Sequence, residues 1–89
     1  SKAITLAPEN YQLHIKRGFI RLDLEDVAGA LEDFKIATLE DPKNGEAWLG
    51  FGNAFYQNGQ VRVACNHWKR AIENGDPRAA DQLAKYCND

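Results

Sequence analysis

The sequence predicts an all-α fold of antiparallel helical hairpins, through an internal repeat and through the helical spacing of its apolar residues. At a shift of 34 positions the chain matches itself at six small, aromatic or helix-breaking residues in order. The six pairs are Pro8 and Pro42, Gly18 and Gly52, Val27 and Val61, Ala30 and Ala64, Phe34 and Trp68, and Ala37 and Ala71. So many ordered matches in so short a chain indicate a repeat.

The expected elements are short helices. Residues 1–6 have the pattern of the tail of a helix whose beginning is absent, and further helices are expected over 10–23, 27–39, 44–57, 61–74 and 77–87. The clearest unit has aromatic residues at i, i+3 and i+7 of its first helix and apolar residues at i, i+4 and i+7 of its second. These residues are Trp48, Phe51 and Phe55, then Ala64, Trp68 and Ala71. Both stripes face one partner, so the unit is predicted to be a helical hairpin.

Turn residues separate these helices. Asn58 and Gly59 can adopt the left-handed conformation that closes a helix and permits a tight return. Pro42 and Pro77 each follow an Asp and precede a helix, where a fixed φ and a missing donor cost little. The turn residues therefore fall between the helices that the apolar spacing predicts.

Composition excludes several classes of function. The chain has 11 basic and 13 acidic residues and a net charge of -2, which gives no electrostatic footprint for nucleic acid or an anionic membrane. No apolar run approaches the ~20 residues that a membrane-spanning helix needs, so a soluble protein is expected. The missing initiator Met suggests a piece of a longer chain.

These residues resemble the tetratricopeptide repeat family. Residues 45–77 fit its pattern through Trp48, Phe51, Gly52, Phe55, Ala64, Trp68 and Ala71, although Pro77 arrives one residue late. Residues 11–42 fit through Gly18, Ala30, Phe34, Ala37 and Pro42, but His14, Arg17 and Arg21 occupy the large apolar places of the first helix. The resemblance implies one domain over 1–89, in which hairpins stack as a right-handed superhelix. Residues 1–8 would be the tail of a preceding repeat and residues 78–89 a capping helix.

Glycine inside a helix calls for a packing reason, because it costs ~1 kcal/mol relative to alanine. Gly52 is expected to face Ala64 or Ala71 at a helix crossing. Gly50 matches no position of the repeat family, and no role is assigned to it.

Arg17 and Arg21 have two interpretations. A guanidinium suits a carboxylate or phosphate ligand, but Arg17 and Asp33 are each eight residues from a turn near Glu25 and should meet across the hairpin. A structural ion pair is therefore favoured for Arg17, while Arg21 stays open. The residues given structural roles are Gly18, Arg17, Asp33, Trp48, Gly52, Ala64, Trp68 and Ala71.

Cys65 and Cys87 lie at similar distances on either side of a turn near residues 75–76, so they can meet. Either they form a disulfide, which requires an oxidising compartment, or they are two half-buried free thiols. The first case would fit an exported bacterial protein and the second a cytoplasmic one. A metal site with His67 is not expected, because Cys65 and His67 are two apart on a helix and point apart. No cofactor or catalytic motif is expected, and an enzyme built on the two cysteines would lack an activating base.

The resemblance also implies a binding surface. The first helix of each hairpin lines the concave side of such a stack. The corresponding residues are Gln12, Ile15, Lys16, Phe19, Leu22, Asp23, Glu46, Leu49, Asn53, Tyr56 and Gln57. Among these, the residues expected to contact a partner are Ile15, Lys16, Phe19, Leu49, Asn53, Tyr56 and Gln57.

Two functions follow as hypotheses. The first is a protein-interaction module that binds a peptide or helix of a partner protein in this groove, with Asn53 holding backbone. Recognition of a C-terminal carboxylate is disfavoured, because Phe19 stands where that branch of the family has an Asn. The alternative is self-assembly into a homo-oligomer through open repeat ends.

Overall fold

The computed structural model describes residues 9–87. Within that range the chain is helical and has no strand, which confirms the all-α class. The helices are α2 (Glu9–Asp23), α3 (Val27–Glu40), α4 (Gly45–Gln57), α5 (Val61–Glu73) and α6 (Arg78–Tyr86). Each agrees with an expected helix to within one residue at either end. The expected tail of an earlier repeat, over 1–8, lies outside the described residues.

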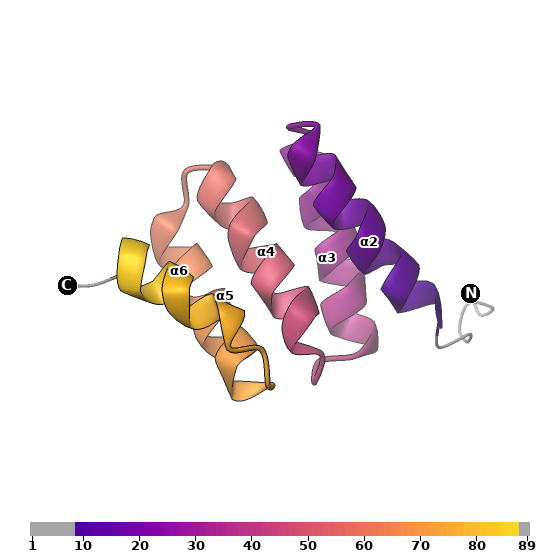
Figure 1. The fold of residues 1–89 in the computed structure, drawn as a ribbon. Coiled ribbons are helices and arrows are strands. Elements are labelled where there is room, and N and C mark those ends of the chain that lie inside the picture. The colour runs from indigo at the N-terminus through magenta and orange to yellow at the C-terminus, as the bar shows by residue number, and fades with distance from the viewer. Residues whose placement is uncertain (1–8, 88–89) are drawn as a thin grey trace.

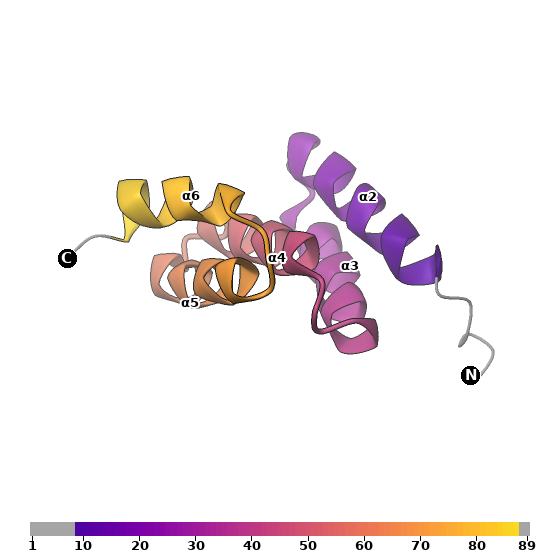
Figure 2. The ribbon, with the colours of Figure 1, turned by 60° about the horizontal axis from the view of Figure 1, so that its bottom comes forward.

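The helices form a row in which each packs against the next along the chain (Figure 1). α2 pairs with α3 and α4 with α5 as two hairpins, α3 joins the hairpins by packing on α4, and α6 packs on α5. α2 also contacts α4, so the first helices of both hairpins meet on one side. The turned view shows α2 and α6 at opposite ends of the row (Figure 2). A right-handed superhelical twist stays a prediction.

Left-handed residues close the hairpins. Glu25, Gly59 and Gly75 have φ values of 64°, 86° and 93°. The expectation for Asn58 is wrong, because its φ is −82° and Gly59 alone takes the left-handed conformation. Glycine adopts that region without the steric cost of a Cβ. The start of α4 is fixed by Asn44, whose side chain accepts hydrogen bonds from two backbone N–H groups of the first turn.

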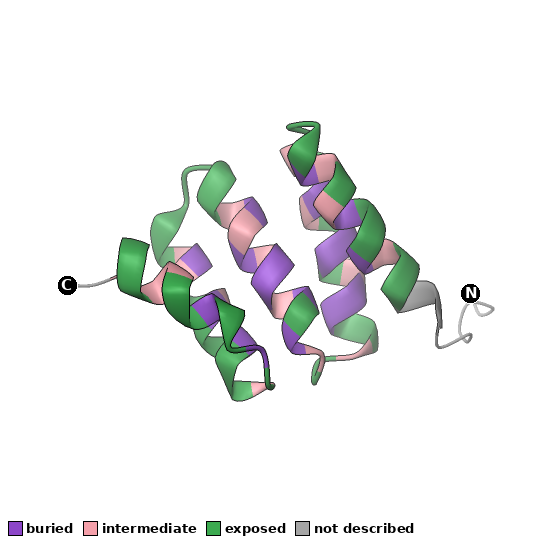
Figure 3. Cartoon of the chain, viewed as in Figure 1, coloured by how far each residue is buried: buried purple, intermediate pink, exposed green. Residues whose placement is uncertain are grey.

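Two apolar clusters make the core, and the buried residues follow the facing sides of the helices (Figure 3). The first cluster contains Ile15, Leu22, Ala30, Phe34, Ala37, Ala47 and Ala54. The second contains Leu49, Ala64, Trp68, Ala71 and Ala79. Phe34 and Trp68 are the largest fully buried apolar side chains and occupy equivalent places in the two repeats. Each hairpin is therefore built around one aromatic ring on its second helix.

Gly50 has a packing role that the sequence did not reveal. A Cβ placed at Gly50 would lie inside van der Waals contact of three ring carbons of Phe34, and a Cβ at Gly18 would lie 2.7 Å from Phe34 Cζ. The ring is thus held between a glycine of its own hairpin and a glycine of the next. This contact joins the two hairpins.

Gly52 faces Ala64, one of the two neighbours expected, but Trp68 lies closer still. Its nearest side chain is the indole of Trp68, since an added Cβ would lie 2.5 Å from Cδ1. The Ala64 carbonyl oxygen is next, at 3.1 Å, and Ala71 is not among its nearest neighbours. The expectation of a close helix crossing holds for Ala64, but the indole makes glycine necessary.

Candidate functional site

Two pockets lie along the paired helices α2 and α4, and we call the surface that carries both of them the groove. The tyrosine pocket, of about 280 Å³, is lined by Phe19, Leu22, Asp23, Asn53, Tyr56, Gln57, Gln82 and Tyr86. The lysine pocket, of about 250 Å³, is lined by Gln12, Ile15, Lys16, Asn44 and Glu46. Every residue that the repeat resemblance places on the groove, except Leu49, lines one of these pockets. The structure therefore brings residues far apart in sequence onto one surface.

Ile15 and Leu49 are not free to bind as expected. Ile15 is 3% exposed and Leu49 is 6% exposed, and they belong to the first and second core clusters. Ile15 forms the floor of the lysine pocket, whereas Leu49 lines neither pocket. The prediction of partner contact is wrong for Leu49, because the second hairpin and α6 use its side chain as core.

Asn53 is partly committed to the fold. Its Oδ1 accepts a hydrogen bond of 2.9 Å from Trp68 Nε1 and one of 3.2 Å from Gln82 Nε2. Because an indole N–H only donates, the oxygen of Asn53 must face Trp68. The amide NH2 group of Asn53 donates to no described residue and is the part that can meet a ligand carbonyl. Asn53, which was expected to hold the backbone of a partner, can therefore offer a ligand only its amide N–H groups.

Aromatic side chains line the tyrosine pocket. Tyr56 and Tyr86 have ring centroids 4.5 Å apart, and both rings pack near Trp68. Partial burial, and then the neighbouring Tyr86, raise the pKa of the Tyr56 phenol above its ordinary value of 10.0, so it stays a neutral donor. Phe19 stacks edge-on against Phe34 with centroids 5.0 Å apart. Tyr56 and Phe19 therefore each pack against a neighbouring aromatic ring.

α6 contributes residues that were not predicted for the groove. Gln82 and Tyr86 line the tyrosine pocket from a helix expected only to cap the repeats. Gln82 and Tyr86 are spaced i and i+4, so they lie on one face of α6, and this spacing is the sequence pattern that could have indicated a shared surface. The pocket exists only because α6 packs back over α5, and that is a tertiary contact.

Asp33 is fully buried at the centre of a charged cluster between α2 and α3. Arg17 donates from Nη2 to Oδ1 at 2.9 Å and from Nε to Oδ2 at 3.0 Å, so the expected ion pair is present. His14 Nδ1 lies 3.1 Å from Oδ1, and Arg21 Nη1 lies 3.3 Å from Oδ2. Burial alone would raise the pKa of Asp33, but the hydrogen bonds and nearby positive charges hold it below 3.8. This cluster holds the hairpin together.

In the second hairpin the position equivalent to Asp33, 34 residues later, is His67. Its neighbours are aromatic rings and not charged groups. Its ring lies 5.5, 4.6 and 4.9 Å from the ring centroids of Trp48, Phe51 and Phe55. These three residues are the equivalents of His14, Arg17 and Arg21. His67 Nδ1 donates to the Val63 carbonyl at 2.8 Å, and burial lowers the pKa of the imidazole below 6.5. One backbone geometry thus carries ionic packing in one repeat and aromatic packing in the other.

The two cysteines are joined. Cys65 on α5 and Cys87, directly after α6, form a disulfide, so the bridged alternative is the one present. It fixes the C-terminal end of α6 on α5, next to Tyr86 of the tyrosine pocket. The disulfide therefore supports one wall of the groove.

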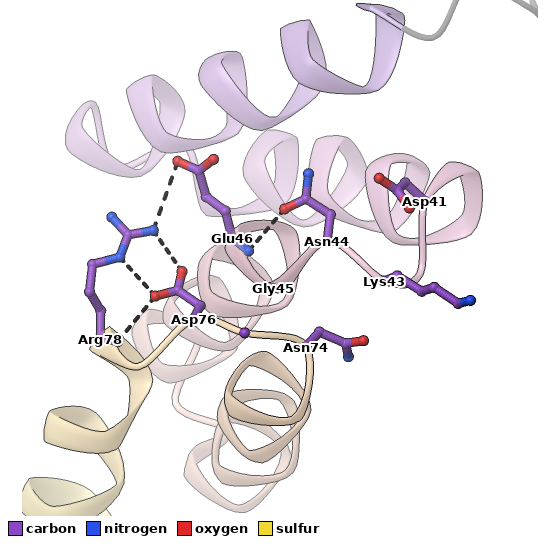
Figure 4. A pocket seen from close by; sticks show the side chains of 9 residues that line it. Asp41, Lys43, Asn44, Gly45, Glu46, Asn74, Asp76 and Arg78 are labelled. Atoms are coloured by element: carbon purple, nitrogen blue, oxygen red, sulfur yellow. Dashed lines mark hydrogen bonds and ion pairs between the residues drawn. The ribbon is translucent and has the colours of Figure 1, made fainter.

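A third, widely open pocket lies at the joint between the hairpins and α6 and is lined by polar groups (Figure 4). Arg78 Nη2 lies 2.6 Å from Asp76 Oδ2 and 4.0 Å from Glu46 Oε2. Hydrogen bonds from Arg78 lower the pKa of the Asp76 carboxyl below 3.8. Asp76 also accepts from the backbone N–H of Arg78 at the start of α6. These charges pair with one another across the joint between α4 and the start of α6.

Over residues 9–87, no group of three or more His, Cys, Asp or Glu side chains is placed to hold a metal ion. In the same stretch no helix has both the length and the apolar character needed to span a membrane. Comparison of the chain with models of known families, with curated proteins and with solved structures gives no match. The resemblance to tetratricopeptide repeats therefore stays a prediction.

Proposed function

We propose that the chain is a protein-interaction module of the tetratricopeptide type, which binds an extended segment of a partner protein in the groove between α2 and α4. The main support is the convergence of Phe19, Asn53 and Tyr56 on one pocket beside α6. These residues come from two repeats, so their meeting depends on how the hairpins pack. Aromatic rings beside amide groups are the usual composition of a peptide-binding pocket.

The groove offers three kinds of contact to such a segment. The paired rings of Tyr56 and Tyr86 provide apolar area. The free NH2 group of Asn53 and the exposed side chain of Gln57 can bond to peptide carbonyl and N–H groups. Lys16, in the lysine pocket, favours an acidic residue at the other end of the bound segment.

Selection of binders from a displayed library of linear peptides tests this proposal. The full chain should enrich peptides whose affinity falls about tenfold, ~1.4 kcal/mol, when Tyr56→Ala is introduced. The matched control is Gln60→Ala, an exposed change outside the groove, which should leave affinity unchanged. Circular dichroism confirms that both variants stay folded. Selected peptides that bind the Tyr56→Ala variant as tightly as the wild type, or a failure to enrich any peptide, would refute the groove.

Self-assembly through stacked ends is the alternative, and it has less support. α6 covers the open side of α5, because Ala79 and Leu83 pack into the same cluster as Trp68. A second copy therefore could not pack its first helix on α5 in the way that α4 packs on α3. Sedimentation at increasing concentration separates the two functions, since the groove proposal predicts a monomer and end-to-end stacking predicts growing oligomers.

A further inference from the structure

A fourth pocket, of about 440 Å³, lies where the end of α6 meets α5, and both cysteines of the disulfide stand in its wall. We call it the cysteine pocket. Cys65 and Cys87 are each only partly buried, so the disulfide is open to small solutes from this side. Exposed disulfides exchange with thiols more readily than buried ones. The residues that line the pocket are Val61, Arg62, Cys65, Asn66, Lys69, Tyr86 and Cys87.

The cysteine pocket carries positive charge. Arg62 and Lys69 are the two charged residues among those that line it, and both are exposed. Neither takes part in an ion pair with a described residue. An anionic solute in the pocket therefore meets two cations and no carboxylate from the described lining residues, which favours anions over cations there.

The same two cations act on Cys65 more than on Cys87. Arg62 and Lys69 are at i−3 and i+4 from Cys65, so all three side chains are neighbours on the surface of α5. Positive charges beside a cysteine favour its thiolate form. Lys85, two residues before Cys87, does not line the pocket.

The position of Cys87 acts in the opposite direction. Cys87 caps the C-terminal end of α6, and its backbone N–H donates to the Leu83 carbonyl. The C-terminal end of a helix presents partial negative charge, which disfavours a thiolate. Cys65 is therefore the better leaving group when the disulfide opens, because a more stable thiolate leaves faster.

From these observations we infer that the cysteine pocket is an exchange site for a small thiol with an anionic group, and that this thiol becomes attached to Cys87. The thiol loses its proton to water, and its thiolate attacks Cys87 Sγ while Arg62 and Lys69 hold the anionic group. A new sulfur–sulfur bond forms to Cys87, the bond between the two cysteine Sγ atoms breaks, and its electron pair remains on Cys65 as a thiolate. One disulfide replaces another, so no further oxidant or reductant is consumed.

The exchange removes the covalent link between α5 and α6. α6 then keeps its non-covalent contacts, chiefly Ala79 and Leu83 in the second core cluster. Gln82 and Tyr86 of α6 line the tyrosine pocket, so the modification loosens one wall of the groove. This consequence rests on the proposed function of the groove, whereas the exchange at Cys87 does not.

Three thiols that share a two-carbon stem test the charge preference. Mercaptoethanesulfonate is anionic, mercaptoethanol is neutral and cysteamine is cationic. The disulfide-bonded full chain is mixed with a large excess of each, the reaction is stopped with acid, and mass spectrometry follows the opening of the disulfide. Rates are compared at equal thiolate concentration and divided by those of a short unstructured peptide disulfide, which corrects for the reactivity of each thiol. The corrected rate should be about tenfold higher for the anionic thiol than for the cationic one.

Variants locate the charges that cause this preference. Arg62→Gln combined with Lys69→Gln should bring the corrected ratio close to one, and a high salt concentration should lower it in the wild type. The matched control is Lys35→Gln combined with Lys43→Gln, which removes the same charge at exposed positions outside the pocket and should keep the wild-type ratio. Circular dichroism confirms that both double variants stay folded.

Digestion in acid at early times maps the attached thiol. The adduct of the anionic thiol should be on Cys87, with Cys65 free. No charge preference in the wild type, a preference that the Arg62 and Lys69 variant retains, an adduct mainly on Cys65, or no adduct on Cys87 would each overturn the inference. None of these measurements uses a ligand of the groove, so a groove that binds no peptide would leave their outcome unchanged.

Discussion

Replacing Gly50 by alanine tests the contact that joins the two hairpins. The added methyl group would enter the space of the Phe34 ring, whose Cδ1 lies only 2.8 Å from the ideal Cβ position and whose Cε1 and Cζ lie closer still. Phe34 has little room to retreat, because the ring also lies against Gly18, where an added Cβ would be 2.7 Å from Cζ, and the residue is fully buried. The methyl group must therefore push α3 and α4 apart or force the ring off its rotamer.

Two opposing effects set the size of the change. Alanine favours helix formation over glycine by ~1 kcal/mol. Overpacking a core costs typically ~1 to 3 kcal/mol, and a ring confined on both sides belongs at the upper end of that range. The net result is a loss of ~2 kcal/mol in the free energy of unfolding. For a domain of this size that loss corresponds to a fall in Tm of roughly 8 to 16 °C.

Urea denaturation followed by circular dichroism, with the disulfide intact, measures this loss. The exposed pair Glu32→Ala and Glu32→Gly on α3 gives the helix-propensity difference in the same protein. Adding Phe34→Leu to Gly50→Ala should recover part of the loss, so that a double-mutant cycle reports a coupling of ~1 kcal/mol or more between the two positions. A Gly50→Ala variant as stable as the wild type, or stabilised by the propensity difference, would refute the packing argument.

Three further predictions concern the charged cluster, the buried imidazole and the disulfide. Because burial lowers the pKa of His67 in the folded state, the unfolded chain takes up the proton first as pH falls through 6.5, and stability declines there; His67→Phe should show a smaller fall of the urea midpoint than the wild type between about pH 7 and pH 5. The pKa of Asp33 is also depressed, so its stabilising effect is present above 3.8 and is lost as pH falls through the lower folded value; Asp33→Asn should be less stable at neutral pH but flatter on acid titration by circular dichroism. Replacing Cys65 and Cys87 by serine opens a loop of 22 residues and should cost ~3 kcal/mol in chemical denaturation, with faster amide exchange in α6; unchanged exchange there would contradict a supporting role for the disulfide.

Local rules predicted most of the fold. The 34-residue repeat and the spacing of Trp48, Phe51 and Phe55 were enough to place every described helix to within one residue. Counting from the turn at Glu25 was enough to pair Arg17 with Asp33. These predictions succeed because helix periodicity and hairpin register act over a few turns and depend little on the rest of the chain.

The candidate site was predicted in outline only. The resemblance placed Phe19, Asn53 and Tyr56 on one surface, and they do line one pocket. It could not show that Leu49 is core or that the oxygen of Asn53 is bonded to Trp68. Those facts depend on how α4, α5 and α6 fit together, and no local pattern in the sequence encodes the distances between them.

The sequence by itself determined the helices, the hairpins and the aromatic residue at the centre of each, because apolar spacing and turn residues carry that information along the chain. Tertiary structure alone decided the role of Gly50, the contribution of Gln82 and Tyr86 to the groove, and the aromatic packing around His67. Each of these depends on distances between side chains from different helices. Such distances follow from the simultaneous fit of all the helices, and a repeat pattern read in one dimension does not contain them.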